Sequence, residues 1–210
     1  MKNFFANASH ELKTPLMSIR GNVDGMRDGY VDMDTGCAVI EKEAERMSNL
    51  VGEILEISRL DSGALQPEFL EYDVREIIYD AASSVMLKAD EKGIKIDVDL
   101  PDPIFRLCDE AMLYSAFSNI LTNAVRYARS FIGISAKPCM DNDQQVTLRF
   151  ENDGEPVSEE DMKHIFDRFY TGKKGQTGIG MALAQGYVKV HGSEICVSVR
   201  NNNTIFEIVI

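Results

Sequence analysis

The sequence has no apolar run long enough to cross a membrane. No stretch of about 18 or more apolar residues occurs among its 210 residues, whereas a membrane-spanning helix needs about 20. The first five residues, Met1 to Phe5, are too few and too polar for a secretory signal. We therefore expect the chain as given to be soluble and to work in the cytoplasm.

Paired cysteines are missing as well. The spacing C-x-x-C, typical of zinc and redox sites, does not occur, since the cysteines lie far apart at Cys37, Cys108, Cys139 and Cys196. We interpret them as reduced thiols of a cytosolic protein. Internal repeats and low-complexity tracts are absent too.

Basic residues are scarce relative to acidic ones. The chain has 22 lysines and arginines against 34 aspartates and glutamates, a formal net charge of -12. This balance repels nucleic acid and anionic lipid surfaces, so we expect no nucleic-acid partner. A hydrophobic content of 44% is enough for one small and one mid-sized unit, each with its own core.

The N-terminal segment is predicted to be an amphipathic helix that carries an outward histidine. Apolar residues alternate at four and three along it, the pattern of a buried coiled-coil seam: Leu12, Leu16, Ile19, Val23, Met26 and Tyr30. His10 falls off that seam, so its imidazole is available as a nucleophile or proton carrier near pH 7. Glu11 can orient the ring, and Thr14 lies one turn further on over the same face.

A second helix, predicted over residues 37–60, repeats the pattern. A short acidic turn between Gly29 and Gly36 should fold the two helices into an antiparallel hairpin. The apolar surface is too broad for one hairpin to cover, so we expect two copies to form a dimeric four-helix bundle. Packing of this face on the second domain is the alternative.

The remainder of the chain is predicted to be an α/β domain. Residues 63–67 form a linker, because Gly63 ends the helix and Pro67 prevents its resumption. Helices are expected over 74–92 and 109–128 and from near Ser158 and Gly178, with strands at 94–100, 131–137, 146–151, 194–200 and 204–210. Segregated helices against a mixed sheet predict a two-layer α/β sandwich, hence an α+β chain with domains 1–62 and 68–210.

Five motifs, in order, resemble those of the sensor histidine kinases of two-component systems. They are a phosphoacceptor box at 5–16, an N box at 119–127, a first glycine box at Asn152-Asp153-Gly154, an F box at 166–170 and a second glycine box at 178–181. The resemblance covers nearly the whole chain and implies the ATP-binding fold shared with gyrase-type and Hsp90-type ATPases. It also implies a catalytic fragment of a longer, membrane-bound receptor whose upstream segments are not in this chain, with a naturally short cytosolic kinase as the alternative.

The resemblance implies a site for ATP and Mg²⁺. Asn123 corresponds to the magnesium ligand and Asn119 to a nearby phosphate contact, and an amide oxygen suits a hard cation that keeps most of its waters. Arg126 can offer a charged fork to a phosphate, and Tyr127 can lie against the purine.

Two glycines and the segment before them complete this expectation. Gly178 and Gly180 precede an apolar helix, so their amides can meet phosphate oxygens. Residues 170–177 resemble the lid over ATP, with Phe169 at its base and Lys173 within it.

The chain departs from the family pattern D-x-G-x-G at the adenine pocket. Asn152 stands at the adenine-reading acid and Pro156 at the second glycine, while Gly154 is retained. A neutral amide is a weaker acceptor than a carboxylate by about 1 kcal/mol, or about fivefold in affinity. Using Asp153 instead would break the spacing to Gly154, so we assign the role to Asn152.

The resulting hypothesis is a homodimeric protein histidine kinase. His10 would take the γ-phosphoryl group of ATP with Glu11 as general base and orienter, and pass it to an aspartate on a response regulator receiver domain. Thr14 would support the reverse, phosphatase activity. The alternatives are a degenerate, nucleotide-sensing dimeric scaffold, which Asn152 and Pro156 motivate, and a topoisomerase-like or chaperone ATPase, which would leave the His10 box without purpose.

Overall fold

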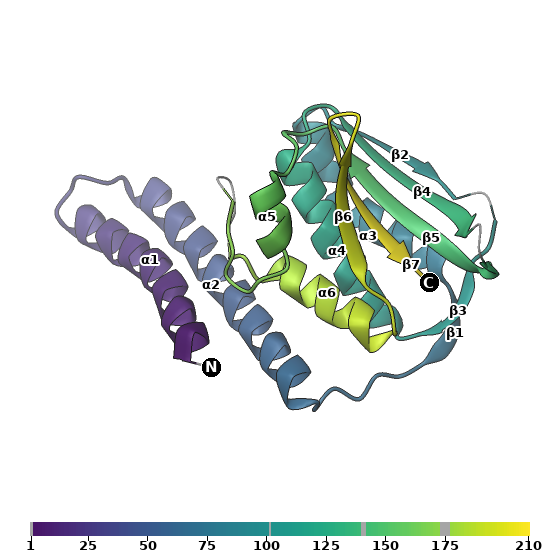
Figure 1. Ribbon diagram of the computed structural model, residues 1–210. Coiled ribbons are helices and arrows are strands. Elements are labelled where there is room, and N and C mark those ends of the chain that lie inside the picture. Colours follow the sequence, from purple (N-terminus) through teal and green to yellow (C-terminus); the bar gives the residue numbers. More distant parts are fainter. Residues whose placement is uncertain (1, 101, 140–141, 173–176) are drawn as a thin grey trace. The chain divides into compact units, whose positions relative to one another are not determined.

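The chain divides into two compact units, residues 1–64 and residues 65–210. The computed structural model describes residues 2–100, 102–139, 142–172 and 177–210. The first unit is a pair of long helices, and the second combines sheets with helices (Figure 1).

The first unit is a helical hairpin of α1 (Lys2–Arg27) and α2 (Met33–Ser62). The Asp32 side chain caps α2 by accepting a hydrogen bond from the Thr35 amide at 3.1 Å. Gly36 is buried inside α2, where an added Cβ would overlap the Met26 side chain. The predicted turn to Gly36 and the predicted helix start at Cys37 are therefore wrong by about one helical turn, because Gly36 serves close helix packing. Gly63, with a left-handed φ of 64°, ends α2.

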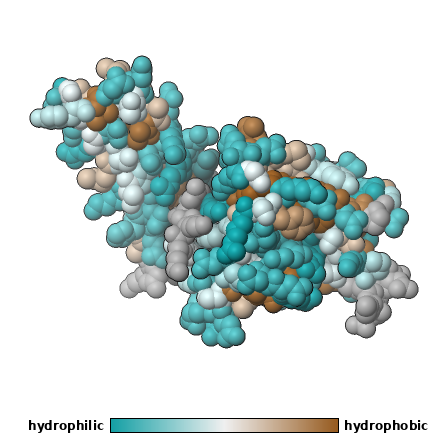
Figure 2. Space-filling model, turned by 90° about the horizontal axis from the view of Figure 1, so that it is seen from above, coloured by the Kyte–Doolittle hydropathy of each residue, from teal (hydrophilic) through white to brown (hydrophobic). Residues whose placement is uncertain are grey.

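Only one flank of the predicted coiled-coil seam is half-buried, and the other flank is exposed. Residues seven apart are half-buried on both helices: Leu12, Ile19 and Met26 on α1, and Ile40, Met47 and Ile54 on α2. The alternate heptad positions are exposed, with Leu16 at 54%, Val23 at 46% and Tyr30 at 88%. On α2 the same holds for Ala44, Val51 and Ser58. Apolar side chains thus emerge on the hairpin among hydrophilic ones (Figure 2), because two helices cover only part of so broad a stripe.

The second unit is built on a mixed five-stranded sheet with the strand order β2-β4-β5-β7-β6. Its strands are β2 (Lys95–Asp99), β4 (Phe131–Cys139), β5 (Asn142–Asn152), β6 (Ile195–Arg200) and β7 (Asn203–Val209). Only β2 and β4 run parallel. One face is covered by α3 (Val74–Glu91), α4 (Glu110–Tyr127) and α6 (Gly180–Val190), as Figure 1 shows. This is the predicted two-layer α/β sandwich.

The core of the second unit lies between these helices and the sheet. Phe117 of α4 meets Phe150 of β5 with ring centroids 5.5 Å apart. Register sets Ile134, Phe150 and Phe206 side by side across β4, β5 and β7, and all are buried. The next row toward the end of β5 contains Ile132, Asn152 and Thr204. Because residues two apart on a strand share a face, Asn152 points to the helical layer as Phe150 does.

A two-stranded antiparallel sheet was not predicted from the sequence. β1 (Leu70–Asp73) pairs with β3 (Phe105–Cys108). Asp73 fixes the ribbon to the start of α3, because it accepts bonds from the Ile104 amide at 3.0 Å and from Arg75 Nη2 at 2.7 Å. The Arg75 guanidinium is the main reason why the pKa of Asp73 falls to about 2. Four-residue strands with exposed apolar side chains offer no periodicity to detect.

Candidate nucleotide and phosphoacceptor site

The candidate phosphoacceptor lies on the solvent side of α1. His10 and Thr14 are exposed one turn apart, and Glu11 between them is half-buried. No residue that the structure describes forms a hydrogen bond or ion pair with His10. Pro15 is buried inside the helix and has no N–H, so the Glu11 carbonyl lacks its usual intrahelical donor. The arrangement leaves the imidazole accessible to a partner molecule.

The candidate base-reading residue is a buried amide at the end of β5. Asn152 is 3% exposed, and Thr204 opposite it on β7 is 2% exposed. The Thr204 hydroxyl accepts a bond from the Val157 amide at 3.3 Å. The Asn152 Nδ2, by contrast, has no hydrogen-bond partner among the described residues. Burying an unpaired donor costs free energy, so Asn152 Nδ2 lacks a hydrogen-bond acceptor that it needs. Thr204 was missed, because an isolated threonine near the chain end belongs to no motif.

Asp153 is committed to a structural role. Its carboxylate accepts bonds from the backbone amides of Arg129, Ser130 and Phe131 at 2.9, 3.0 and 3.0 Å and from the Ser130 hydroxyl at 2.6 Å. Burial acts to raise the pKa of Asp153, but these bonds outweigh it and hold the pKa at about 2. Asp153 therefore fastens the loop between α4 and β4, and this geometry favours Asn152 over Asp153 as the inward group.

Gly154 brings the first glycine box against the end of α4. An added Cβ there would overlap the Tyr127 carbonyl and lie 2.8 Å from Asn152 Nδ2. The Tyr127 hydroxyl in turn lies 3.5 Å from a Cβ built on Gly172, at the start of the predicted lid. Asn152, Gly154, Tyr127 and Gly172 thus form one contiguous cluster, and glycine is required where the backbones meet.

The second glycine box closes the base of the predicted lid. The Phe169 amide donates to the Gly178 carbonyl at 2.8 Å, and both residues have positive φ, 62° and 65°. A Cβ on Gly178 would lie 2.6 Å from the Tyr170 carbonyl oxygen. This pair joins the two ends of residues 170–177. Lys173, predicted to contact the nucleotide, lies outside the described residues.

Gly180 and the N box face each other. A Cβ on Gly180 would lie 2.6 Å from Asn119 Oδ1, and Asn119 donates through Nδ2 to the Ser115 carbonyl at 3.0 Å. Asn123, one turn further along α4, is half-buried. The cap residue Ile179 makes no side-chain bond to the first turn of α6, whereas side chains cap α2 to α5. Among the described residues, the first amides of α6 therefore have no side-chain acceptor beside the N box.

Arg126 lies at a cavity on the other flank of α4. The cavity has a volume of about 470 Å³ and is lined by residues of α3 and α4 and by Lys92: Val85, Lys88, Glu91, Lys92, Thr122, Val125 and Arg126. Lys92 Nζ is bonded to the Val125 carbonyl at 2.9 Å. The structure thus groups Arg126 with two lysines, and its predicted contact with phosphate stays a prediction.

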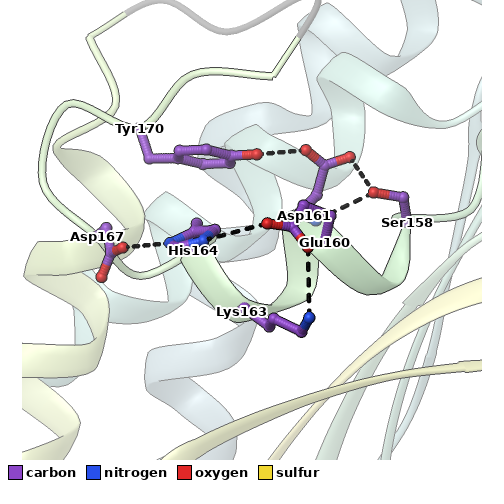
Figure 3. A network of polar contacts seen from close by, with 7 residues as sticks. All are labelled: Ser158, Glu160, Asp161, Lys163, His164, Asp167 and Tyr170. Carbon is purple, nitrogen blue, oxygen red and sulfur yellow. Dashed lines mark hydrogen bonds and ion pairs between the residues drawn. The ribbon is translucent and has the colours of Figure 1, made fainter.

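A polar network supports the start of the predicted lid (Figure 3). The Tyr170 hydroxyl donates to Asp161 Oδ1 at 2.5 Å, and its ring lies 5.4 Å from that of His164 on α5 (Glu159–His164). His164 Nδ1 lies 2.7 Å from Asp167 Oδ2, and Glu160 approaches the other ring nitrogen at 3.7 Å. The Asp167 bond is the main cause of a raised His164 pKa. The F box contains Asp167 and Tyr170, but no sequence motif pointed to Asp161 or His164.

Among the residues that the structure describes, no group of three or more histidine, cysteine, aspartate or glutamate side chains could hold a metal ion. No helix in the same residues is both long and apolar enough to span a membrane.

Two protein-family models match the chain. Residues 1–63 match the His Kinase A (phospho-acceptor) domain, and residues 108–210 match the histidine kinase-, DNA gyrase B-, and HSP90-like ATPase. Sensor histidine kinase TrcS of Mycobacterium tuberculosis is 33% identical over 99% of this chain and 43% of its own length. The chain spans about half the length of the curated relatives it matches.

Solved structures share the fold. Histidine kinase AdeS of Acinetobacter baumannii has a TM-score of 0.80 at 22% identity, covering 96% of both chains. Histidine kinase ThkA, solved in complex with the response regulator protein TrrA, also has a TM-score of 0.80, at 21% identity over 99% of this chain and 60% of the other.

Proposed function

This chain belongs to the sensor histidine kinases of two-component systems, and from that premise we propose that it is an ATP-dependent kinase that phosphorylates itself on His10. The observation that carries the proposal is the exposed His10, which is held on a matched phosphoacceptor domain and has no partner among the described residues. The ATPase-type domain on the same chain would bind ATP, which is the phosphoryl donor. Nothing in the comparisons favours the degenerate scaffold.

The chemistry assigned to the first unit is nucleophilic. An imidazole nitrogen of His10 bonds to the γ-phosphorus of ATP while the bond between that phosphorus and the ADP oxygen breaks. Glu11 orients the ring and accepts its proton, which a carboxylate at the adjacent position can do. The phosphoryl group then moves to an aspartate carboxylate of a response regulator, and His10 is regenerated. The ThkA–TrrA complex is a precedent for such a pairing in a protein of this fold.

The second unit binds the substrate ATP. Gly178 and Gly180 place the uncapped first turn of α6 next to Asn119, so backbone amides can meet the phosphates. Asn123 would hold Mg²⁺, which takes few protein ligands and neutralises phosphate charge when bound. Asn152 and Tyr127 would contact the base of the nucleotide. The glycine contacts and the unpaired Asn152 donor fit such a ligand.

Homodimerisation and phosphatase activity belong to the same proposal. The exposed heptad positions of α1 and α2 fit a second copy of the hairpin, which would complete a four-helix bundle. Thr14, exposed one turn from His10, can orient a water that hydrolyses the phosphorylated response regulator. The membrane-bound receptor origin and the cytoplasmic location stay predictions.

The test is labelling with γ-labelled ATP in the presence of Mg²⁺. We expect an acid-labile label that disappears in His10→Gln, while ATP affinity and thermal stability stay unchanged. Arg20→Gln, an exposed change two to three turns further along α1, is the matched control and should retain the label. Label that survives in His10→Gln would contradict the assignment of the acceptor.

A further inference from the structure

The inner face at the end of β5 contains a hydrogen-bond donor that has no acceptor among the described residues. Asn152 and Thr204 are the two buried polar residues of the described chain, and they stand side by side in a row that Ile132 continues. Thr204 is engaged by the Val157 amide, whereas Asn152 Nδ2 has no acceptor within reach among the described residues. An orphaned donor that is buried beside Gly154 and Tyr127 points to an acceptor supplied by a ligand.

An amide differs from a carboxylate in kind as well as in strength. An ionised carboxylate only accepts hydrogen bonds, whereas Asn152 offers one accepting oxygen and a donating NH₂ group. The terminal torsion of asparagine has two broad, nearly equivalent settings about 180° apart. The buried group can therefore present either its donor or its acceptor at the same point without moving the backbone.

Adenine and 6-oxopurines present opposite hydrogen-bonding groups along the edge of the six-membered ring. Adenine presents an acceptor at N1 and a donor at its 6-amino group, and the Asn152 oxygen can accept from that amino group. A 6-oxopurine reverses both, with an acceptor at O6 and a donor at N1. In the same position a carboxylate would face O6 with like charge, whereas Asn152 turned by 180° would donate Nδ2 to O6 and accept from N1–H.

We propose that Asn152 is a specificity-determining residue that lets the nucleotide site accept 6-oxopurine nucleoside triphosphates as well as ATP. The inference rests on the proposed function, because it requires that the base of the bound nucleotide lies against Asn152. The unpaired Nδ2 fits this assignment, because it is the atom that would donate to a 6-oxo group.

The experiment compares inosine triphosphate with ATP, because the hypoxanthine base has the 6-oxo edge without the 2-amino group of guanine. Calorimetry with Mg²⁺ should show the two nucleotides binding the parent protein within about tenfold of each other. In Asn152→Asp, ATP should bind about fivefold tighter, whereas inosine triphosphate should bind about tenfold weaker or worse. Asn49→Asp, an exposed change in the first unit, adds the same charge and should leave the ratio unchanged.

The outcomes separate this inference from the function on which it rests. ATP binding together with strong rejection of inosine triphosphate by the parent would overturn the inference alone. Equal ratios in the parent and in Asn152→Asp would also overturn it, because the amide would then not read the base. If neither nucleotide binds the parent, the proposed function fails together with the inference. Self-phosphorylation from γ-labelled inosine triphosphate that is lost in His10→Gln would support both the proposed function and this inference.

Discussion

The two units differ in how they bury their apolar side chains and hold their candidate site residues. On the hairpin, the apolar side chains at alternate positions of the seam are exposed to solvent, and the candidate phosphoacceptor His10 has no partner among the described residues. In the second unit, rows of apolar side chains on β4, β5 and β7 are buried under three helices. Hydrogen bonds and close glycine contacts fix the loops of the candidate site. We therefore expect another molecule to complete the first unit, whereas the second unit positions its candidate site by itself.

This difference follows from the chemistry assigned to each unit. A phosphoacceptor must meet a nucleotide and then a response regulator, so it has to remain exposed on a rigid support. Catalysis of phosphoryl transfer by positioning requires the nucleotide to be held at fixed points. The comparison therefore predicts that changes on the hairpin act through association and that changes in the second unit act through folding and ligand affinity.

The largest effect is expected on the exposed flank of the hairpin. Val51→Lys would bury an unpaired charge from each copy in the proposed four-helix bundle, and symmetry doubles that cost. We expect the dimer to weaken by about a hundredfold and self-phosphorylation to fall with it. Sedimentation across a concentration series measures the dissociation constant. Asn49→Lys adds the same charge on another face of α2 and should remain dimeric; equal dissociation in both variants would refute this interface.

The next effect tests the glycine contacts of the second unit. Gly178→Ala combines a positive φ of 65° with a Cβ that would meet backbone atoms of Phe169 and Tyr170, which cannot move aside cheaply. We expect a loss of about 2 kcal/mol or more in unfolding free energy and at least tenfold in ATP affinity. Gly192→Ala has a similar φ of 75° but open space around it, so it should cost only about 1 kcal/mol. Equal effects would show that strain alone, without the close approach, limits this position.

The sequence was sufficient where local signals agree with the tertiary structure. The helix predicted over 109–128 is observed as Glu110–Tyr127, because Asp109 caps it and a long apolar face binds it to the sheet. It was insufficient where a distant residue decides. Gly36 looks like a turn residue but is buried under Met26, and the pairing of β1 with β3 depends on Asp73 and Ile104, which lie 31 positions apart.

The site shows the same limit. The N box predicted that Asn119 and Asn123 belong to one site, but the packing of Gly180 on Asn119 joins segments that are 61 positions apart in the sequence. The orphaned donor of Asn152 is also a tertiary fact, because it exists only when β5 lies between β4 and β7. Motif order identified the parts, and the sheet register decides which of their atoms face one another.

A smaller effect is expected at Asp153. Its pKa of about 2 lies below the model-peptide value of 3.8, so its contribution to stability is present above that value and is lost as the pH falls through about 2. Asp153→Asn removes the charge from four hydrogen bonds and should cost about 1–2 kcal/mol at pH 7. Thermal unfolding from pH 7 to pH 2 should show the parent and the variant converging in acid. A difference that persists at pH 2 would mean that shape rather than charge fastens this loop.

The smallest effect is expected at His164, where an exposed network replaces buried contacts. The bond to Asp167, with Glu160 nearby and Lys163 opposing, raises the His164 pKa above 6.5. A raised folded pKa gives stability that is fully present below 6.5 and is lost as the pH rises through the folded value. His164→Gln should therefore lower the melting temperature slightly at pH 6 and not at pH 8.5, because exposed pairs contribute little. If the same pH dependence appears in ATP affinity, the network acts on the lid through Tyr170. If it appears in stability alone, α5 is braced independently of the nucleotide, and the self-contained character of the second unit extends to its most exposed helix.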